Sequence, residues 1–215
     1  MSQHKPPPHD AAPAGERVRD RIFRTARELF YRQGIRAVGV DAIASEAGTN
    51  KMSFYRSFAS KDELVAECLR AQEDEYWLWW NTVTAPHAGD PRAQIEALFA
   101  ANAERSRRIE SCGCAINNAA VELRDEMHPG HIIILEHKAE VRRRLRALAA
   151  AAGAEDADTL GDALMLLLEG SAATRLTFDD CDSAPLCKAS AGARALLDAY
   201  LPAAGERAAK RRGAA

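Results

Sequence analysis

The chain has 215 residues, of which 47% are hydrophobic and 28% charged, and a formal net charge of −2 at pH 7. These values are typical of a globular protein with one or two domains, and they exclude a fibrous protein and a small domain held together by a metal. No apolar run approaches the roughly 18 residues that a membrane-spanning helix needs, so we expect no transmembrane segment and no membrane partner.

The N-terminal segment 1–15 contains four prolines and no apolar core. We therefore expect a disordered tail on a cytoplasmic protein rather than a secretory signal. Charge is distributed unevenly, because residues 1–63 contain eleven Lys and Arg against eight Asp and Glu, whereas the remainder is net acidic. The five cysteines are an odd number on a chain without an export signal, which indicates reduced thiols.

Helical periodicity dominates from Glu16 onward, and no segment alternates in the manner of a strand. Asn50 is suited to cap a helix, and Phe54 and Phe58, four residues apart, should face inward from it. Ser60 and Glu63 have the spacing of a capping box. Helices are expected at 16–33, 40–47, 50–58, from 60 to about 85, and at 91–110, 114–125, 129–151, 156–176 and 184–201.

The expected helix 129–151 carries two patterns. Its apolar residues predict an inward face made of Ile132, Ile133, Leu135, Val141, Leu145 and Leu148. Its basic run consists of Arg142, Arg143, Arg144 and Arg146. Because Glu136 and Glu140 precede this run at helical spacing, we expect ion pairs within the helix rather than a second nucleic-acid surface.

The first three helices lie within about forty residues and include a turn of about four residues, the arrangement of a helix-turn-helix. Such a unit reads base edges by hydrogen bonds and phosphates by cations on its outward face. The outward polar side chains should be Lys51, Ser53, Tyr55 and Arg56. The amides beside Thr49 and Asn50 offer a phosphate site. Lys61 is unfavourable for the dipole of the next helix, so a phosphate partner explains it better.

The order of apolar, aromatic, glycine and lysine residues from Arg17 to Leu69 resembles the DNA-binding domain of TetR-family transcriptional regulators. The residues that carry the resemblance are Ile22, Ala26, Leu29, Phe30, Gly34, Val40, Ile43, Ala44, Ala47, Gly48, Asn50, Lys51, Phe54, Tyr55, Phe58, Lys61 and Leu64. The resemblance implies that Tyr55 and Lys61 contact phosphates. It places four side chains near base edges, namely Lys51, Met52, Ser53 and Arg56. Gly39 departs from the family pattern, since a Ser or Thr usually caps the second helix there, and Met52 replaces a small residue.

The resemblance implies an all-α fold of about nine helices. A three-helix, helix-turn-helix DNA-binding domain at 16–62 would precede a ligand-binding and dimerisation domain at 63–202 and a basic tail at 203–215. The resemblance further implies a small-molecule pocket among the fourth to eighth helices and dimerisation through the last two. Candidate ligand-binding residues are Trp77, Trp80, Phe99, Cys114, Asn117, Met127 and His131. Candidate dimer-interface residues are Leu164, Leu168, Ser171, Arg175, Ala193, Leu197 and Tyr200.

The expected function is that of a homodimeric repressor that a small-molecule inducer releases from a palindromic, double-stranded DNA operator. Two alternatives stay open. One is a dimeric regulator without an inducer, and the other is a thiol or metal sensor that uses Cys112 and Cys114, although their spacing to His128 and His131 fits no standard zinc site. No cofactor is expected, and no enzyme, because the sequence contains no nucleophile elbow, phosphate-binding glycine loop, zinc-protease motif or carboxylate pair.

Overall fold

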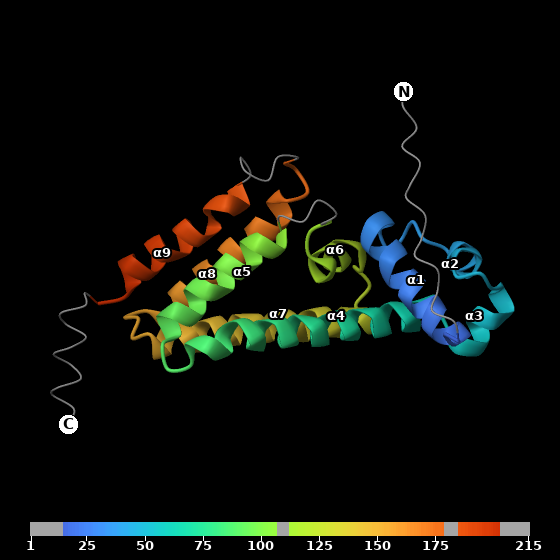
Figure 1. The fold of residues 1–215 in the computed structure, drawn as a ribbon, viewed down its shortest axis with the longest axis horizontal. Coiled ribbons are helices and arrows are strands. Elements are labelled where there is room, and N and C mark those ends of the chain that lie inside the picture. The colour runs from blue at the N-terminus through green and yellow to red at the C-terminus, as the bar shows by residue number, and fades with distance from the viewer. Residues whose placement is uncertain (1–14, 107–111, 179–184, 203–215) are drawn as a thin grey trace. The chain divides into compact units, whose positions relative to one another are not determined.

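A computed structural model describes residues 15–106, 112–178 and 185–202 (Figure 1). Within these ranges there are nine α-helices, two short 3-10 helices and no strand, which confirms the all-α prediction. The tails expected at 1–15 and 203–215 lie outside the described residues, apart from Gly15. The chain divides into two compact units between Cys68 and Leu69. This boundary lies later than the expected one after residue 62, because the first two turns of α4 belong to the first unit.

The first unit contains three complete helices and the start of a fourth. Their bounds are Val18–Gln33 for α1, Val40–Glu46 for α2, Lys51–Ser57 for α3 and Lys61–Thr84 for α4. Gly48 has a φ of +62°, a left-handed conformation that glycine adopts without strain, and it turns the chain between α2 and α3. Ser60 Oγ caps α4 as expected by accepting from the Glu63 amide at 3.0 Å, while Glu63 Oε2 accepts at 2.9 Å from the amide of Ala59, one residue before the cap residue that a capping box would use.

The second unit is a layered helical bundle. Its helices are α5 (Pro91–Ser106), α6 (Ala115–Glu122), α7 (Pro129–Ala151), α8 (Ala157–Thr174) and α9 (Ala189–Tyr200), with 3-10 turns at Ala85–His87 and Pro185–Lys188. Helices α5, α8 and α9 lie side by side, and α7 packs against both α5 and α8 (Figure 1). Apolar side chains from α4 and from these four helices form one core, which includes Trp80, Phe99, Val141, Leu145, Leu164 and Leu197.

The predicted inward face of α7 was wrong at two positions. Ile132 and Leu135 are 53% and 52% exposed. The buried side chains of this helix are Ile133, Ile134, His137, Val141, Leu145 and Ala149. The run of apolar residues at the start of α7 permits several helical phases, and a buried histidine, which the periodicity argument did not count as apolar, belongs to the correct one.

Half of the arginine run pairs within α7 as expected. Glu140 accepts hydrogen bonds from Arg143 at 2.6 and 2.7 Å and from Arg144 at 2.7 Å. These bonds, led by those from Arg143, lower the pKa of the Glu140 carboxyl to about 2. The carboxylate is therefore charged over the whole physiological range.

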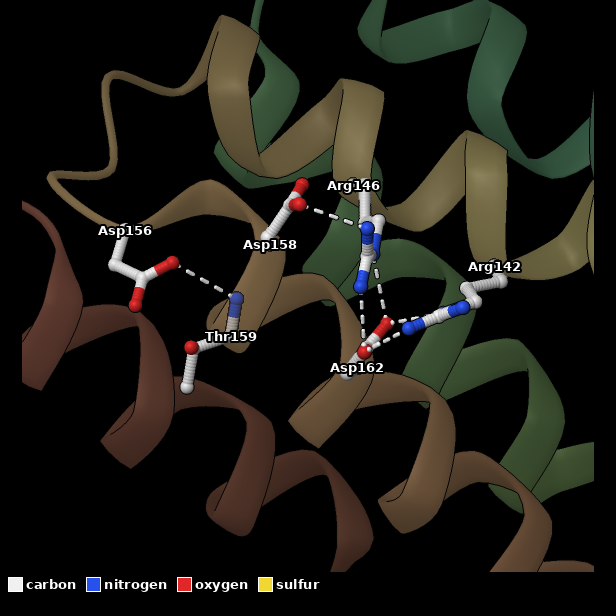
Figure 2. Close-up of polar contacts among 6 residues, drawn as sticks. All are labelled: Arg142, Arg146, Asp156, Asp158, Thr159 and Asp162. Carbon is white, nitrogen blue, oxygen red and sulfur yellow. Dashed lines mark hydrogen bonds and ion pairs between the residues drawn. The ribbon is translucent and has the colours of Figure 1, made fainter.

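The other half of the run reaches the neighbouring helix instead (Figure 2). Arg142 and Arg146 both bind the carboxylate of Asp162 on α8, with N–O distances of 2.6 to 2.8 Å. Arg146 also reaches Asp158 at 2.8 Å, while Asp156 caps α8 by accepting from the Thr159 amide at 3.0 Å. Hydrogen bonds from the two arginines hold the pKa of the Asp162 carboxyl well below its usual range. These contacts join α7 to α8 at the edge of their apolar contact.

Gly161 lets the backbones of α7 and α8 approach each other beside these ion pairs. A Cβ atom at this position would lie 2.5 Å from Arg146 Cγ and 2.7 Å from Arg146 Cα. The same atom at Gly170, also on α8, would meet nothing within 4 Å. The two glycines therefore differ in packing although they share a helix.

We expect Gly161→Ala to lower the free energy of unfolding by about 1–3 kcal/mol, because the added methyl group forces the two helices apart. Gly170→Ala is the matched control and should raise it by about 0.4–1 kcal/mol through helix propensity. Urea unfolding followed by circular dichroism measures both. Equal effects of the two substitutions would contradict the close helix contact.

Candidate nucleic-acid interface

Two phenylalanines fix the orientation of α3. Phe54 and Phe58 are 0% and 2% exposed, and their ring centroids lie 5.9 Å apart. The Asn50 side chain starts the helix by accepting from the Ser53 amide at 3.0 Å, as the sequence predicts. With this side anchored, the opposite side of α3 faces solvent.

The solvent-facing side of α3 carries most of the residues expected there. Met52 is 76% exposed and Tyr55 is 51% exposed, while Lys51 and Arg56 are also exposed. The Tyr55 ring meets Phe54 edge-on, with centroids 5.3 Å apart, so a buried neighbour supports its position. This side of α3 offers a cation at each end, with a phenol and a thioether between them.

Ser53 does not face outward as predicted. It is only 9% exposed, and its Oγ accepts a hydrogen bond from Arg56 Nη2 at 2.9 Å. Its carbonyl accepts from Ser57 Oγ at 2.9 Å. Ser53 is covered because its amide is bonded to the Asn50 side chain and its hydroxyl and carbonyl are bonded to the side chains of Arg56 and Ser57, one turn further along α3. Ser53 is therefore placed to orient the Arg56 guanidinium rather than to meet a base edge itself.

The backbone amide of Thr49 is not available as a phosphate donor, because it donates to the Ala44 carbonyl at 2.8 Å. This corrects the expectation of a phosphate site at that amide. Gly39 begins α2 without a side-chain cap, which agrees with the departure noted in the sequence. The expectation of a phosphate contact at Asn50 stays a prediction.

Lys61 has a role within the protein that the sequence argument did not consider. Its Nζ donates to the Ile35 carbonyl at 2.5 Å and lies 5.9 Å from the centroid of the Phe30 ring. The side chain thus ties the start of α4 to the segment that follows α1. This contact explains a lysine at the first position of a helix without a phosphate partner.

The first unit is similar to a known family of DNA-binding proteins. Residues 22–68 match the family model for bacterial regulatory proteins of the tetR family. The chain is 34% identical over 99 residues to the HTH-type transcriptional repressor KstR2 of Rhodococcus jostii, covering 46% of this chain and 48% of that protein. It is 29% identical over 145 residues to the HTH-type transcriptional regulator TcmR of Streptomyces glaucescens, covering 66% of this chain and 63% of that protein. The chain thus spans less than two thirds of the length of these curated relatives.

Solved structures of TetR-family regulators are similar in fold to this chain over most of its length. A putative tetR transcriptional regulator from Streptomyces avermitilis is 28% identical with a TM-score of 0.75, covering 86% of this chain and 98% of that one. A TetR-family transcriptional regulator from Streptomyces coelicolor is 27% identical with a TM-score of 0.72, covering 86% and 96%. Residues 22–68 of this chain belong to the TetR family. Helices α2 and α3, with the turn at Gly48 between them, have the arrangement of a helix-turn-helix. The second unit is the larger of the two.

Within the second unit, the candidate ligand residues do not all come together. Trp80 and Phe99 are 4% and 0% exposed within the core, and Met127 is 88% exposed. His131 is partly buried, and its Nδ1 lies 3.3 Å from the Leu123 carbonyl oxygen. The remaining three candidates, Trp77, Cys114 and Asn117, belong to a cluster of polar and aromatic side chains between helices.

We call this group the interhelical cluster and define it as Tyr76, Trp77, Cys114, Asn117, His137, Lys138 and Glu169. Lys138 Nζ donates to both oxygens of Glu169, at 2.7 Å each, and also to Asn117 Oδ1. These three side chains are partly buried and come from α7, α8 and α6. The neighbouring Asn118 instead donates to the Cys112 carbonyl at 2.8 Å, so it has a structural role.

Aromatic rings form the other half of the interhelical cluster. The His137 ring centroid lies 4.7 Å from that of Tyr76 and 5.3 Å from that of Trp77. His137 is 1% exposed, and its Nδ1 has no hydrogen-bond partner, the Glu73 carboxylate lying 3.7 Å away. Burial lowers the pKa of His137 to about 4, so the ring is neutral at pH 7. Burial also raises the pKa of Tyr76, helped by the nearby Cys114 and Glu169.

Sequence reasoning missed Tyr76, His137, Lys138 and Glu169 as candidate site residues. No pattern in the sequence pairs Lys138 with Glu169, because 31 residues separate them. The one available signal was the polar pair at positions 137 and 138, which lies between Glu136 and Glu140 and so does not stand out. That signal could not identify the partners on the other helices.

Most of the candidate dimer-interface residues lie inside the subunit. Five of them are at most 7% exposed, namely Leu164, Leu168, Ser171, Ala193 and Leu197. Their side chains have almost no surface to offer a second chain, because α8 and α9 bury the predicted stripe against the subunit's own core. Arg175 and Tyr200 are partly exposed. Periodicity identified the apolar face of each helix but not what that face packs against.

The histidines considered for a metal sensor have backbone contacts. His128 Nδ1 accepts from the Gly130 amide at 2.9 Å and thereby caps α7. Over the described residues, no group of three or more His, Cys, Asp and Glu is placed to hold a metal ion. The helices in the same part of the chain include none with the length and apolarity to cross a membrane.

The two lysines of the first unit should differ in their effect on stability. We expect Lys61→Met to lower the free energy of unfolding by about 1 kcal/mol, because it removes the hydrogen bond to the Ile35 carbonyl. Lys51→Met, at an exposed position, should change it by less than about 0.5 kcal/mol. Thermal and urea unfolding provide the measurement. If both variants are as stable as wild type, Lys61 has no structural role, and a phosphate partner again becomes the better explanation of this lysine.

Proposed function

We propose that this chain is a ligand-responsive DNA-binding transcriptional regulator, a repressor that binds a palindromic operator as a homodimer. The observation that carries the proposal is the outward side of α3, where Lys51, Tyr55 and Arg56 are exposed opposite two buried phenylalanines. Recognition helices of this kind enter the major groove and read base edges with their N-terminal residues. Membership of the TetR family supports the same function.

Individual roles follow from the chemistry of each side chain. Arg56 suits a guanine edge, since its guanidinium can donate two parallel hydrogen bonds. Tyr55 suits a phosphate oxygen through its hydroxyl group. Met52, with 76% of its surface exposed, suits a thymine methyl group. Ser53 would act indirectly by holding the Arg56 guanidinium.

We further propose that α8 and α9 form the dimer interface through their exposed sides. Leu166 on α8 is 74% exposed, and Arg194 and Ala195 on α9 are also exposed. Dimerisation through such helices would set two recognition helices about 34–36 Å apart, one turn of the duplex. The operator would then repeat its half-site with inverted orientation.

We propose the interhelical cluster as the inducer site. It combines ring surfaces with hydrogen-bonding groups, as small-molecule sites generally do. His137 Nδ1 supports this assignment, because a buried nitrogen without a partner is unfavourable and a ligand hydroxyl group or a water molecule could satisfy it. An inducer would weaken DNA binding by as much as it prefers the conformation with low DNA affinity.

Selection of bound duplexes from a random pool tests DNA binding and symmetry together. We expect a palindrome with half-sites about one helical turn apart. Arg56→Ala should weaken binding to the selected duplex by about 1–3 kcal/mol and relax preference at one position of each half-site. Tyr55→Phe should weaken binding to selected and random duplexes alike, because it removes a phosphate contact.

Arg124→Ala, which removes the same charge from an exposed residue of the second unit, is the control and should leave the selected sequence unchanged. A selected sequence without inverted symmetry would contradict the dimer. Unchanged binding by both α3 variants would contradict the assigned interface.

A screen for compounds that release the protein from the selected duplex tests the inducer site. Trp77→Leu should raise the compound concentration needed for half-release by about three- to tenfold, because it removes one ring of the cluster. Met127→Ala is the matched control at an exposed position. Equal responses of the two variants, each normalised to its own DNA affinity, would place the inducer elsewhere.

A further inference from the structure

The ion pair between Asp41 and Lys51 joins the two helices of the helix-turn-helix at the surface. Lys51 Nζ lies 3.1 Å from Asp41 Oδ2, and the side chains are 56% and 76% exposed. Asp41 belongs to the first turn of α2, and Lys51 is the first residue of α3. Water and salt screen such an exposed pair, so Lys51 can leave it at little cost in free energy.

Contact with DNA would affect the two partners in opposite ways. Phosphates attract the Lys51 ammonium group, as do the N7 and O6 acceptors of guanine, whereas they repel the Asp41 carboxylate. Because the first helix of a helix-turn-helix crosses the DNA backbone and the second enters the groove, both groups would lie at the interface. The carboxylate therefore competes directly with DNA for the same cation.

A lysine held in this pair adds little net charge to the surface. On a duplex without a suitable base acceptor, only phosphates compete with the carboxylate for Lys51, and the ion pair opposes that competition by about 0–1 kcal/mol. On a duplex that offers a well-placed acceptor, the gain of a base contact, about 1–3 kcal/mol, exceeds the worth of an exposed ion pair, about 0–1 kcal/mol. The exchange is therefore more favourable at the correct site than elsewhere.

We infer that Asp41 is a positioning residue that raises specificity by withholding Lys51 from non-cognate DNA. The inference rests on the proposed function, since it concerns how the same surface chooses its DNA. Judged by charge alone, the Asp41 carboxylate would only weaken DNA binding, whereas this inference gives it a role in specificity.

Binding of the full chain to two duplexes tests this role, one selected from the random pool and one with the same bases in shuffled order. Asp41→Asn should raise affinity for the shuffled duplex by about two- to fivefold, because Lys51 is no longer held. Its dependence on salt should steepen by about one unit of slope, as expected for one more phosphate contact. Affinity for the selected duplex should change less, so the ratio of the two affinities falls.

Two controls separate this role from a general effect of charge. In a Lys51→Met background, Asp41→Asn should leave the ratio of affinities unchanged, because no lysine remains to be withheld. Asp20→Asn removes the same charge from an exposed residue of α1 and should also leave the ratio unchanged. Thermal unfolding should show that each variant is as stable as its parent.

The possible outcomes are distinct. An equal rise in affinity for both duplexes, no rise for either, or the same fall in the ratio without Lys51 would each overturn the inference. Failure of the wild-type chain to bind any duplex would contradict the proposed function itself and this inference with it. A fall in the ratio that depends on Lys51 would establish the role of Asp41.

Discussion

The burial of Phe54 and Phe58 is the constraint on which the first unit depends. A helix of seven residues has little stability of its own, because its few internal hydrogen bonds hardly offset the entropy of forming it. Its position is therefore set by what its apolar side buries. Once these two rings are inside, Lys51, Tyr55 and Arg56 have to face solvent, and the chemistry of α3 as a recognition surface follows.

Polar contacts around this helix then decide which cations are available. Asp41 holds Lys51, Ser53 orients Arg56, and the Ile35 carbonyl holds Lys61. A basic surface is thus a set of cations with different partners, and the partners determine what each cation can do. The exposed carboxylate of Asp41 fits this view as part of the recognition surface.

The second unit combines an apolar core with polar contacts between helices. Asp162 ties α7 to α8 through two arginines, and Gly161 lets the two backbones approach. The interhelical cluster has the opposite character, since it leaves His137 Nδ1 buried without a partner. Under the proposed function, a ligand that satisfies this nitrogen would stabilise whichever arrangement of the helices it binds more tightly.

The sequence by itself determined the helical class, nearly all the helices, the capping of α3 by Asn50 and the inward direction of Phe54 and Phe58. These features depend on residues within about four positions of one another, and local spacing therefore predicts them. Tertiary structure alone decided the partners of Asp162, the phase of α7, the burial of Ser53 and the fact that the stripes of α8 and α9 pack into their own subunit. Each of these depends on which helix lies opposite, and periodicity states that a face is apolar without stating what covers it.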